Sequence, residues 1–161
     1  MIRIQRITPG HALYAQEVAL RELVLLKPIG YDHARFCREY PYEDRFVHFV
    51  AIHPLPTGDR VVGCALLLPP ADGDGQAKGG KLMQMAVDPQ RQREGIGQKL
   101  VVDLERYAFA RLGLNRLYCH AQLSAVPFYE RLGWIIEGEE FDEAGIPHRK
   151  MSFEAEVPGR A

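Results

Sequence analysis

The part of the chain that decides the fold reads Leu82-Met-Gln-Met-Ala-Val87-Asp88-Pro89-Gln-Arg-Gln92-Arg-Glu-Gly95-Ile-Gly97. A mostly apolar run of strand length leads there into a proline-containing turn, two glycines and a helical pattern. The free N–H groups of a first helical turn, together with the helix dipole, favour a phosphate. Gly95 and Gly97 remove side chains where the main chain would approach such a ligand. The stretch therefore predicts a phosphate-binding turn.

Composition narrows the class of protein. With 161 residues, 47% of them hydrophobic, the chain is expected to form one globular domain. A formal net charge of −1 argues against nucleic acid as a partner, and basic residues gather only locally, at Arg91, Arg93 and Lys99. We expect no membrane segment and no signal peptide, because no apolar run is long enough.

The cysteines indicate the cellular setting. Cys37, Cys64 and Cys119 are an odd, unclustered set. We therefore expect neither a disulfide framework nor a zinc site, no metal of any kind, and a reducing cytoplasm.

Periodicity and turn residues predict the elements before the turn. A helix capped by Thr8 is expected to run to about Leu26, with Ala15, Val18 or Ala19, Leu23 and Leu26 on one face. The other expected elements are a strand over Ile2–Ile7, a helix over Tyr31–Tyr42, strands over Phe46–Ile52 and Arg60–Leu68 joined by a turn-rich 53–59, and a flexible 69–80.

After the strand Lys81–Val87, the pattern predicts a long helix that presents Gly97, Val101, Leu104 and Ala108 on one face and stops near Gly113. We then expect a strand over Arg116–His120, a short helix capped by Ser124 and ending at Gly133, and a hairpin of Trp134–Phe141 and Ile146–Phe153. The order of elements predicts a single α/β domain with a mixed sheet.

Two other phosphate-binding motifs are excluded at this turn. A P-loop requires Gly-Lys-Ser/Thr, but Gly97 is followed by Gln98-Lys99-Leu100. A dinucleotide fingerprint requires a further glycine or alanine where Leu100 stands, and an acidic residue where the next strand ends in Cys119-His120.

The turn instead resembles the coenzyme A signature Gln/Arg-x-x-Gly-x-Gly/Ala of the GNAT acetyltransferases, here Gln92-Arg-Glu-Gly95-Ile-Gly97 after Val87-Asp88-Pro89. Downstream, Ala121-Gln122-Leu-Ser-Ala125-Val-Pro-Phe128-Tyr129-Glu-Arg-Leu132-Gly133-Trp134 is similar to the second signature of that family. Gly145-Ile-Pro147-His148 is similar to a smaller, ElaA-like branch.

The resemblance implies an α/β (α+β) fold with a mixed, mostly antiparallel sheet, flanked by helices and splayed between its two central strands. It implies one domain over residues 1–154 with a short tail over 155–161. The implied activity is direct acetyl transfer from acetyl-coenzyme A to a primary amine of a small molecule or peptide. The alternative is a non-catalytic acyl-coenzyme A sensor or interaction module. A monomer or a homodimer is expected.

The resemblance also implies which residues bind the donor. Main-chain groups around Met85 and Val87 would pair with the pantetheine arm like an added strand. The full expected set is Met85, Ala86, Val87, Gln92, Arg93, Glu94, Gly95, Ile96, Gly97, Gln98, Gln122 and Tyr129.

Tyr129 matches the family's general acid, which protonates the departing thiolate. We expect Phe128 to face the core and Tyr129 to project the other way. Lys81 stands where many relatives carry a glutamate base, so the candidates for the base are His148, His120 and a water relay.

Two further expectations concern neighbouring side chains. Cys119 and His120 should point to opposite strand faces, so they cannot form a nucleophilic pair. Basic and polar residues of the first helices suggest an acceptor with a carboxylate or phosphate; they are Arg21, Lys27, Tyr31, Arg35 and Arg38.

Overall fold

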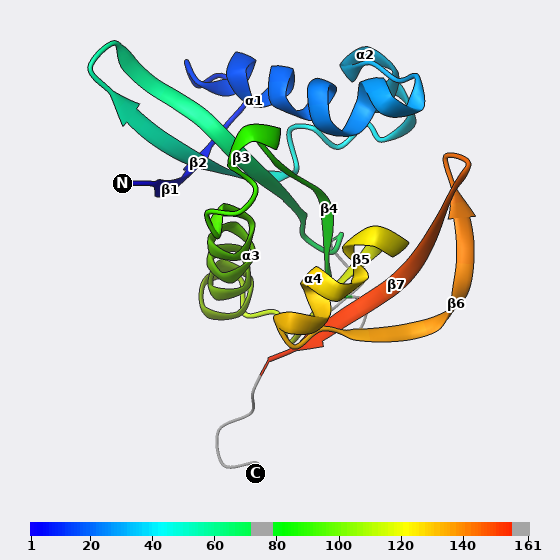
Figure 1. The fold of residues 1–161 in the computed structure, drawn as a ribbon. Helices are drawn as coiled ribbons and strands as arrows, with labels where there is room; N and C mark the ends of the chain where they lie inside the picture. The colour runs from blue at the N-terminus through cyan, green and yellow to red at the C-terminus, as the bar shows by residue number, and fades with distance from the viewer. Residues whose placement is uncertain (72–78, 156–161) are drawn as a thin grey trace. The chain divides into compact units, whose positions relative to one another are not determined.

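The computed structural model of the protein describes residues 1–71 and 79–155 (Figure 1). The chain forms two compact units, one of residues 1–68 and 83–104, the other of residues 69–82 and 105–161. Most of the predicted flexible segment 69–80, and all of the predicted tail after Ala155, lie outside the described residues.

Seven strands form one mixed sheet, in the order β1-β2-β3-β4-β5-β7-β6. The pairs β1–β2, β2–β3, β5–β7 and β6–β7 are antiparallel, whereas β4 and β5 are parallel. The predicted mixed, mostly antiparallel sheet is therefore confirmed. β4 (Gly80–Val87) contributes its first three residues to the second unit and the remainder to the first.

In the first unit, β1 (Arg3–Ile7), β2 (Val47–Leu55) and β3 (Gly58–Leu68) form an antiparallel meander. The helix α1 (Tyr14–Arg21) packs Leu20 against Val50, Ile52 and Cys64. The helix α3 (Ile96–Arg106) packs on the other face, where Gly63 leaves room for the side chains of Ile96 and Leu100. The third helix of this unit is α2 (His33–Glu39).

In the second unit, β5 (Arg116–Gln122) pairs with β7 (Ile146–Glu154), and β7 pairs with β6 (Ile135–Glu143). The helix α4 (Val126–Arg131) follows β5. The ring of Trp134 stacks on Phe153 at a centroid distance of 5.8 Å and anchors the aromatic core of this unit.

Several predicted boundaries were wrong. The strands β2 and β3 extend to Leu55 and from Gly58, so most of the predicted turn 53–59 is strand. Thr8 does not cap the first helix, which starts at Tyr14 after a turn, and Ser124 lies in a short 3₁₀ turn ahead of α4. Short-range cap patterns occur in turns as well as at helix starts, so they misplace boundaries.

The predicted apolar face of the first helix was wrong in part, since Leu26 is buried but Ala15 and Ala19 are exposed. Leu23 is 56% exposed, whereas Glu17 and Arg21 are fully buried with Leu20. The helix buries a pair of charged residues, whereas hydrophobic periodicity predicts that charged residues face solvent.

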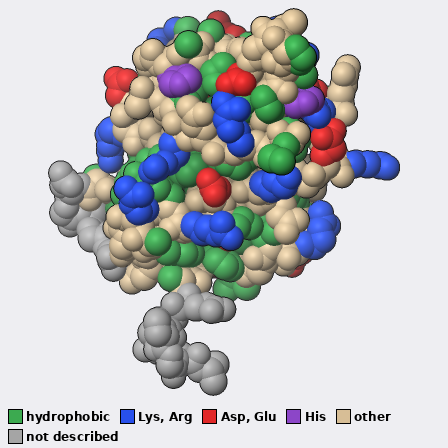
Figure 2. Space-filling model, turned by 90° about the vertical axis from the view of Figure 1, so that its left-hand side faces the viewer, with side chains coloured by type: hydrophobic (Ala, Val, Ile, Leu, Met, Phe, Trp, Pro, Cys, Tyr) green, Lys and Arg blue, Asp and Glu red, His purple; other side chains and the backbone are tan. Residues whose placement is uncertain are grey.

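The charged side chains do not form one continuous surface on the face shown in Figure 2. Lysine and arginine side chains there are interspersed with acidic and uncharged ones. A charged ligand would therefore be attracted by a small local group of side chains and not by a whole face of the protein.

Candidate active site

The predicted phosphate turn is built by hydrogen bonds at the end of β4. The Asp88 N–H donates to the Val62 carbonyl at 2.9 Å, and the Asp88 carboxylate accepts from the Gln90 N–H at 2.9 Å. A 3₁₀ turn, Pro89–Arg91, follows, and the Gln92 side-chain amide donates to the Val87 carbonyl at 3.3 Å. These bonds hold the connection to α3 in one conformation.

Gly95 sets the direction in which α3 begins. Its φ is +77°, and a Cβ built there would meet nothing within 4 Å. The first helical bond runs from the Lys99 N–H to the Gly95 carbonyl at 3.1 Å. The amides of Ile96, Gly97 and Gln98 thus precede the helical ladder and have no partner within it.

The three basic residues near the turn differ in their contacts and in their exposure to solvent. Arg91 donates to His53 Nδ1 at 2.6 Å and to the Glu94 carboxylate at 3.2 Å. Arg93 and Lys99 are exposed. Arg91 therefore helps to shape the turn, while Arg93 and Lys99 face solvent.

The backbone of β4 changes its pairing along its length. The recorded pairs with β5 join Gly80–Leu82 to Leu117–Cys119, although β4 continues to Val87. Ala86 and Val87 are buried, and Met85 is half-buried. Residues 83–87, which include the predicted pantetheine contacts, thus lie beyond the recorded pairs with β5, while β3 is the other neighbour of β4 in the sheet.

A cavity of about 390 Å³ adjoins the same turn in the first unit. Its walls come from α1, from β3 and from the residues that follow β4; they are Gln16, Ala19, Leu20, Leu23, Arg60, Val61, Asp88, Pro89 and Gln90. A partly apolar hollow beside Asp88, Pro89 and Gln90 leaves room for a bound small molecule.

Tyr129, the predicted acid, lies in the second unit on α4 and is only 5% exposed. Phe128 is the half-buried neighbour, so the predicted orientation of this pair was wrong. The Tyr129 ring packs against Trp134 at 5.3 Å between centroids, which requires it to point inward. Burial raises the pKa of Tyr129 well above its usual value, so the hydroxyl keeps its proton at neutral pH.

The alternation predicted for β5 is confirmed. Cys119 is buried, whereas His120 is half-buried on the other face of the strand. Burial raises the pKa of the Cys119 thiol to about 12, so this thiol is protonated as well as turned away from His120.

Both predicted histidines contact one carboxylate, that of Glu143. His120 Nδ1 lies 3.0 Å from Glu143 Oε1, and His148 Nε2 lies 3.8 Å from Glu143 Oε2. The hydrogen bond from His120 holds the pKa of Glu143 below its usual value. His148 is buried, its Nδ1 donates to the Ile146 carbonyl at 2.6 Å, and it pairs in register with Gln122.

Lys81, which occupies the position of the family's glutamate, belongs to the same unit as this cluster. Burial lowers its pKa, while the charge of Glu143 opposes that change.

Sequence reasoning missed Glu143, which lies 23 positions from His120. Glu143 is one of several acidic residues in β6 and the following turn, and only the register of the hairpin distinguishes it. Arg21 was misjudged as a recognition residue, because it is buried and donates to Glu43 at 2.6 Å.

Within the described parts of the chain, no helix is long and apolar enough to cross a membrane.

A family model described as an acetyltransferase (GNAT) domain matches residues 56–155. The chain therefore belongs to the GNAT acetyltransferase family, and this part of the predicted resemblance is confirmed. The ElaA-like branch stays a prediction.

Curated relatives share part of the sequence. An uncharacterized N-acetyltransferase, YjcF of Bacillus subtilis, is 37% identical over 73 residues, or 45% of this chain and 51% of its own length. The B. subtilis protein YyaT is 35% identical over 74 residues, or 46% and 49%. The chain spans about half the length of the curated relatives it matches.

Solved structures share the fold. An aminoglycoside 6′-N-acetyltransferase complexed with coenzyme A superposes with a TM-score of 0.76 at 20% identity, covering 97% of this chain and 99% of that one. A GNAT family acetyltransferase from Elizabethkingia anophelis with acetyl-CoA bound gives a TM-score of 0.68 at 18% identity, covering 96% and 98%.

Proposed function

We propose that the protein transfers an acetyl group from acetyl-coenzyme A to a primary amine of a small molecule or peptide. The observation that carries this proposal is the turn between β4 and α3. It combines the family's signature with open space at Gly95 and with amides that have no partner in the helix. The relatives of the same fold include proteins with coenzyme A or acetyl-CoA bound.

The residues present suit a pyrophosphate carried by a coenzyme A. The amides of Ile96, Gly97 and Gln98 would supply directed donors, and the exposed Arg93 and Lys99 would add positive charge. Met85 and Val87 would offer main-chain groups to an extended arm. When bound, the donor supplies a thioester whose carbonyl carbon accepts the amine.

The chain then has two proton transfers to perform. The Tyr129 O–H, kept protonated by burial, would donate to the departing sulfur. For the base we propose His120, because it is more exposed than the buried His148 that the sequence favoured. The Glu143 carboxylate accepts from His120 Nδ1–H, which leaves the Nε2 lone pair to take a proton from the amine.

The test of the activity is release of free thiol from acetyl-coenzyme A across a panel of amines, alongside calorimetric binding of coenzyme A. Binding and amine-dependent thiol release are expected together. Binding without transfer to any amine would favour the sensor, and absence of binding would refute both functions.

The choice of base is tested by pH–rate profiles of His120→Ala and His148→Ala. We expect His120→Ala to lower kcat by about 100-fold and to lose the limb of the profile that reports the base. His148→Ala should keep that limb. If both variants keep the wild-type limb, neither histidine is the base and a water relay takes its place.

A further inference from the structure

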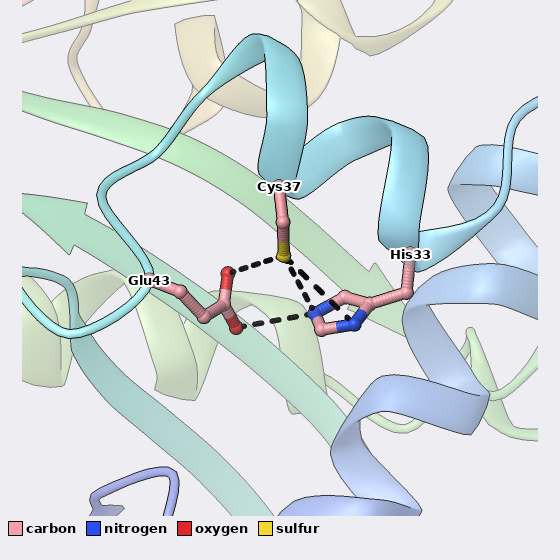
Figure 3. A group of neighbouring side chains, drawn as sticks. All are labelled: His33, Cys37 and Glu43. Carbon is pink, nitrogen blue, oxygen red and sulfur yellow. Dashed lines mark hydrogen bonds and ion pairs between the residues drawn. The ribbon is translucent and has the colours of Figure 1, made fainter.

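We propose that His33, Cys37 and Glu43 form a site for a zinc-class divalent cation. The three side chains converge beside α2, as Figure 3 shows. Their possible ligand atoms all lie within 4.8 Å of one another. This proposal is independent of acetyl transfer and replaces the expectation of no metal, which considered only the number and spacing of cysteines.

The positions of the ligands follow from the helix. His33 and Cys37 are four residues apart on α2, so both project from one face. Glu43 reaches the same point from the segment between α2 and β2. Thiolate, imidazole and carboxylate together are a ligand set typical of zinc.

The distances suit a tetrahedral ion. Zinc bonds of about 2.0–2.3 Å place two ligands of a tetrahedron about 3.3–3.6 Å apart. Cys37 Sγ lies 3.4 Å from His33 Nε2 and 4.0 Å from Glu43 Oε1. A small rotation of the Cys37 side chain would close the second gap.

His33 Nε2 has no short partner among the described residues. It lies 3.3 Å from the Tyr14 hydroxyl and 3.4 Å from Glu43 Oε2, both longer than the common hydrogen-bond length of about 2.9 Å. A nitrogen with several long contacts can turn its lone pair to a cation.

Arg21 leaves one carboxylate position of Glu43 open. Glu43 Oε2 accepts from Tyr14 at 2.5 Å and from Arg21 at 2.6 Å, so both of its lone pairs are used. Oε1 accepts from Arg21 Nη2 at 3.1 Å and keeps a second lone pair on the side that faces Cys37. Arg21 also faces Glu17, so this guanidinium is one positive charge beside two carboxylates.

A neighbouring group of Glu17, Glu43 and His48 also gathers possible ligands, but it is already satisfied. Both ring nitrogens of His48 have partners at 2.9 Å, Glu17 Oε2 and the Glu43 carbonyl. Arg21 Nη1 lies within 3.0 Å of both carboxylates and supplies the positive charge. Of the two groups, that of His33, Cys37 and Glu43, which are partly buried, is therefore the one whose atoms are free to bind an ion.

Solvent reaches the proposed site. The side chains of His33 and Glu43 are 23% and 15% exposed. An ion can enter, and a water molecule would complete a fourth position. Binding requires the Cys37 thiol to release its proton to solvent, so affinity should rise with pH.

The experiment is titration of the reduced, EDTA-treated full chain with Zn²⁺ and, separately, Co²⁺. One equivalent should bind, and Co²⁺ should give a thiolate charge-transfer band in the near ultraviolet. Cys37→Ser should lose that band and weaken zinc binding by at least about 10-fold. His33→Gln should weaken binding similarly, whereas His11→Ala, at an exposed histidine, should not.

Far-ultraviolet circular dichroism verifies that the variants fold. Zinc should also raise the Tm of the wild type and of His11→Ala but not that of Cys37→Ser. The proposal is wrong if the wild type shows no thiolate band, or if folded Cys37→Ser binds zinc as tightly as the wild type.

Discussion

At the scale of single residues, Glu43 is a centre of hydrogen bonding in the first unit. It accepts from Tyr14 and twice from Arg21, and its backbone carbonyl contacts His48. Burial by itself would raise the pKa of this carboxyl, but the Arg21 guanidinium and the Tyr14 hydroxyl outweigh it and lower the pKa to about 2. The charged form is therefore the one that stabilises the fold.

The sign of the pH dependence follows from that shift. A carboxyl whose pKa falls from 4.5 to about 2 stabilises the folded state above pH 4.5 and loses that contribution as the pH falls toward 2. In metal-free buffer, Glu43→Gln should lower the free energy of unfolding by about 2 kcal/mol at pH 7. Urea unfolding from pH 7 to pH 2 should show the difference from wild type shrinking with acid. A difference that stays constant or grows would contradict this.

The contribution of His48 to stability changes with pH in the opposite direction. Its burial favours the neutral ring, but the hydrogen bond and charge of Glu17 outweigh this and raise the pKa. A raised histidine pKa stabilises the fold below the ordinary value of 6.5, and this contribution is lost as the pH rises through the folded-state pKa. The two groups together predict that stability is greatest in mildly acidic solution.

The role of Tyr129 is tested by removing its hydroxyl. Tyr129→Phe keeps the ring that packs on Trp134, so the fold should be retained. We expect kcat to fall by about 100-fold with little change in the affinity for acetyl-coenzyme A. Tyr42→Phe, at a half-buried tyrosine between α2 and β2, serves as the control. Unchanged turnover in Tyr129→Phe would remove the proposed acid.

At the scale of elements, the turn between β4 and α3 is held in place by a few hydrogen bonds. Asp88 and Gln92 tie the turn to Val62 and Val87, and Gly95 adopts the left-handed conformation that starts α3. Local sequence decides the bond from Gln92 to Val87 and the conformation of Gly95, whereas the bond from Asp88 to Val62 joins the turn to β3. The turn could therefore be predicted before any tertiary contact was known.

Gly30 is a matched control for Gly95. Their φ angles are +76° and +77°, and neither position has an atom within 4 Å of a built Cβ. Alanine at either should cost about 1–2 kcal/mol of stability. Only Gly95→Ala should weaken coenzyme A binding, by about 10-fold, because it alone alters the turn. Equal effects on binding, measured by calorimetry, would mean that the turn is not the donor site.

At the scale of the whole molecule, we propose that residues 1–154 fold as one domain despite the two compact units. β4 and α3 each contribute residues to both units, so neither unit contains all of its elements. Trp134, the one tryptophan of the chain, is buried in the second unit and reports on that unit.

Gly63→Ala tests this cooperativity from the first unit. Its Cβ would lie 2.9 Å from Ile96 Cγ2 and 3.0 Å from Leu100 Cδ1, in a fully buried contact. Overpacking of this kind should cost about 1–3 kcal/mol. The unfolding midpoint should shift equally by Trp134 fluorescence and by circular dichroism. A shift seen by only one probe would mean that the units unfold separately.

The sequence by itself determined the sheet class, the order of the elements and the turn from Gln92 to Gly97. Strand alternation and glycine positions act over a few residues, so these features can be predicted from the local sequence. Only the tertiary structure placed Tyr129 inward, because its contact with Trp134 decides the direction. Only the tertiary structure joined Glu143 to His120 and His148, and Glu43 to Arg21, His33 and Cys37. Such partners come from separate elements, and hairpin register and helix packing bring them within reach.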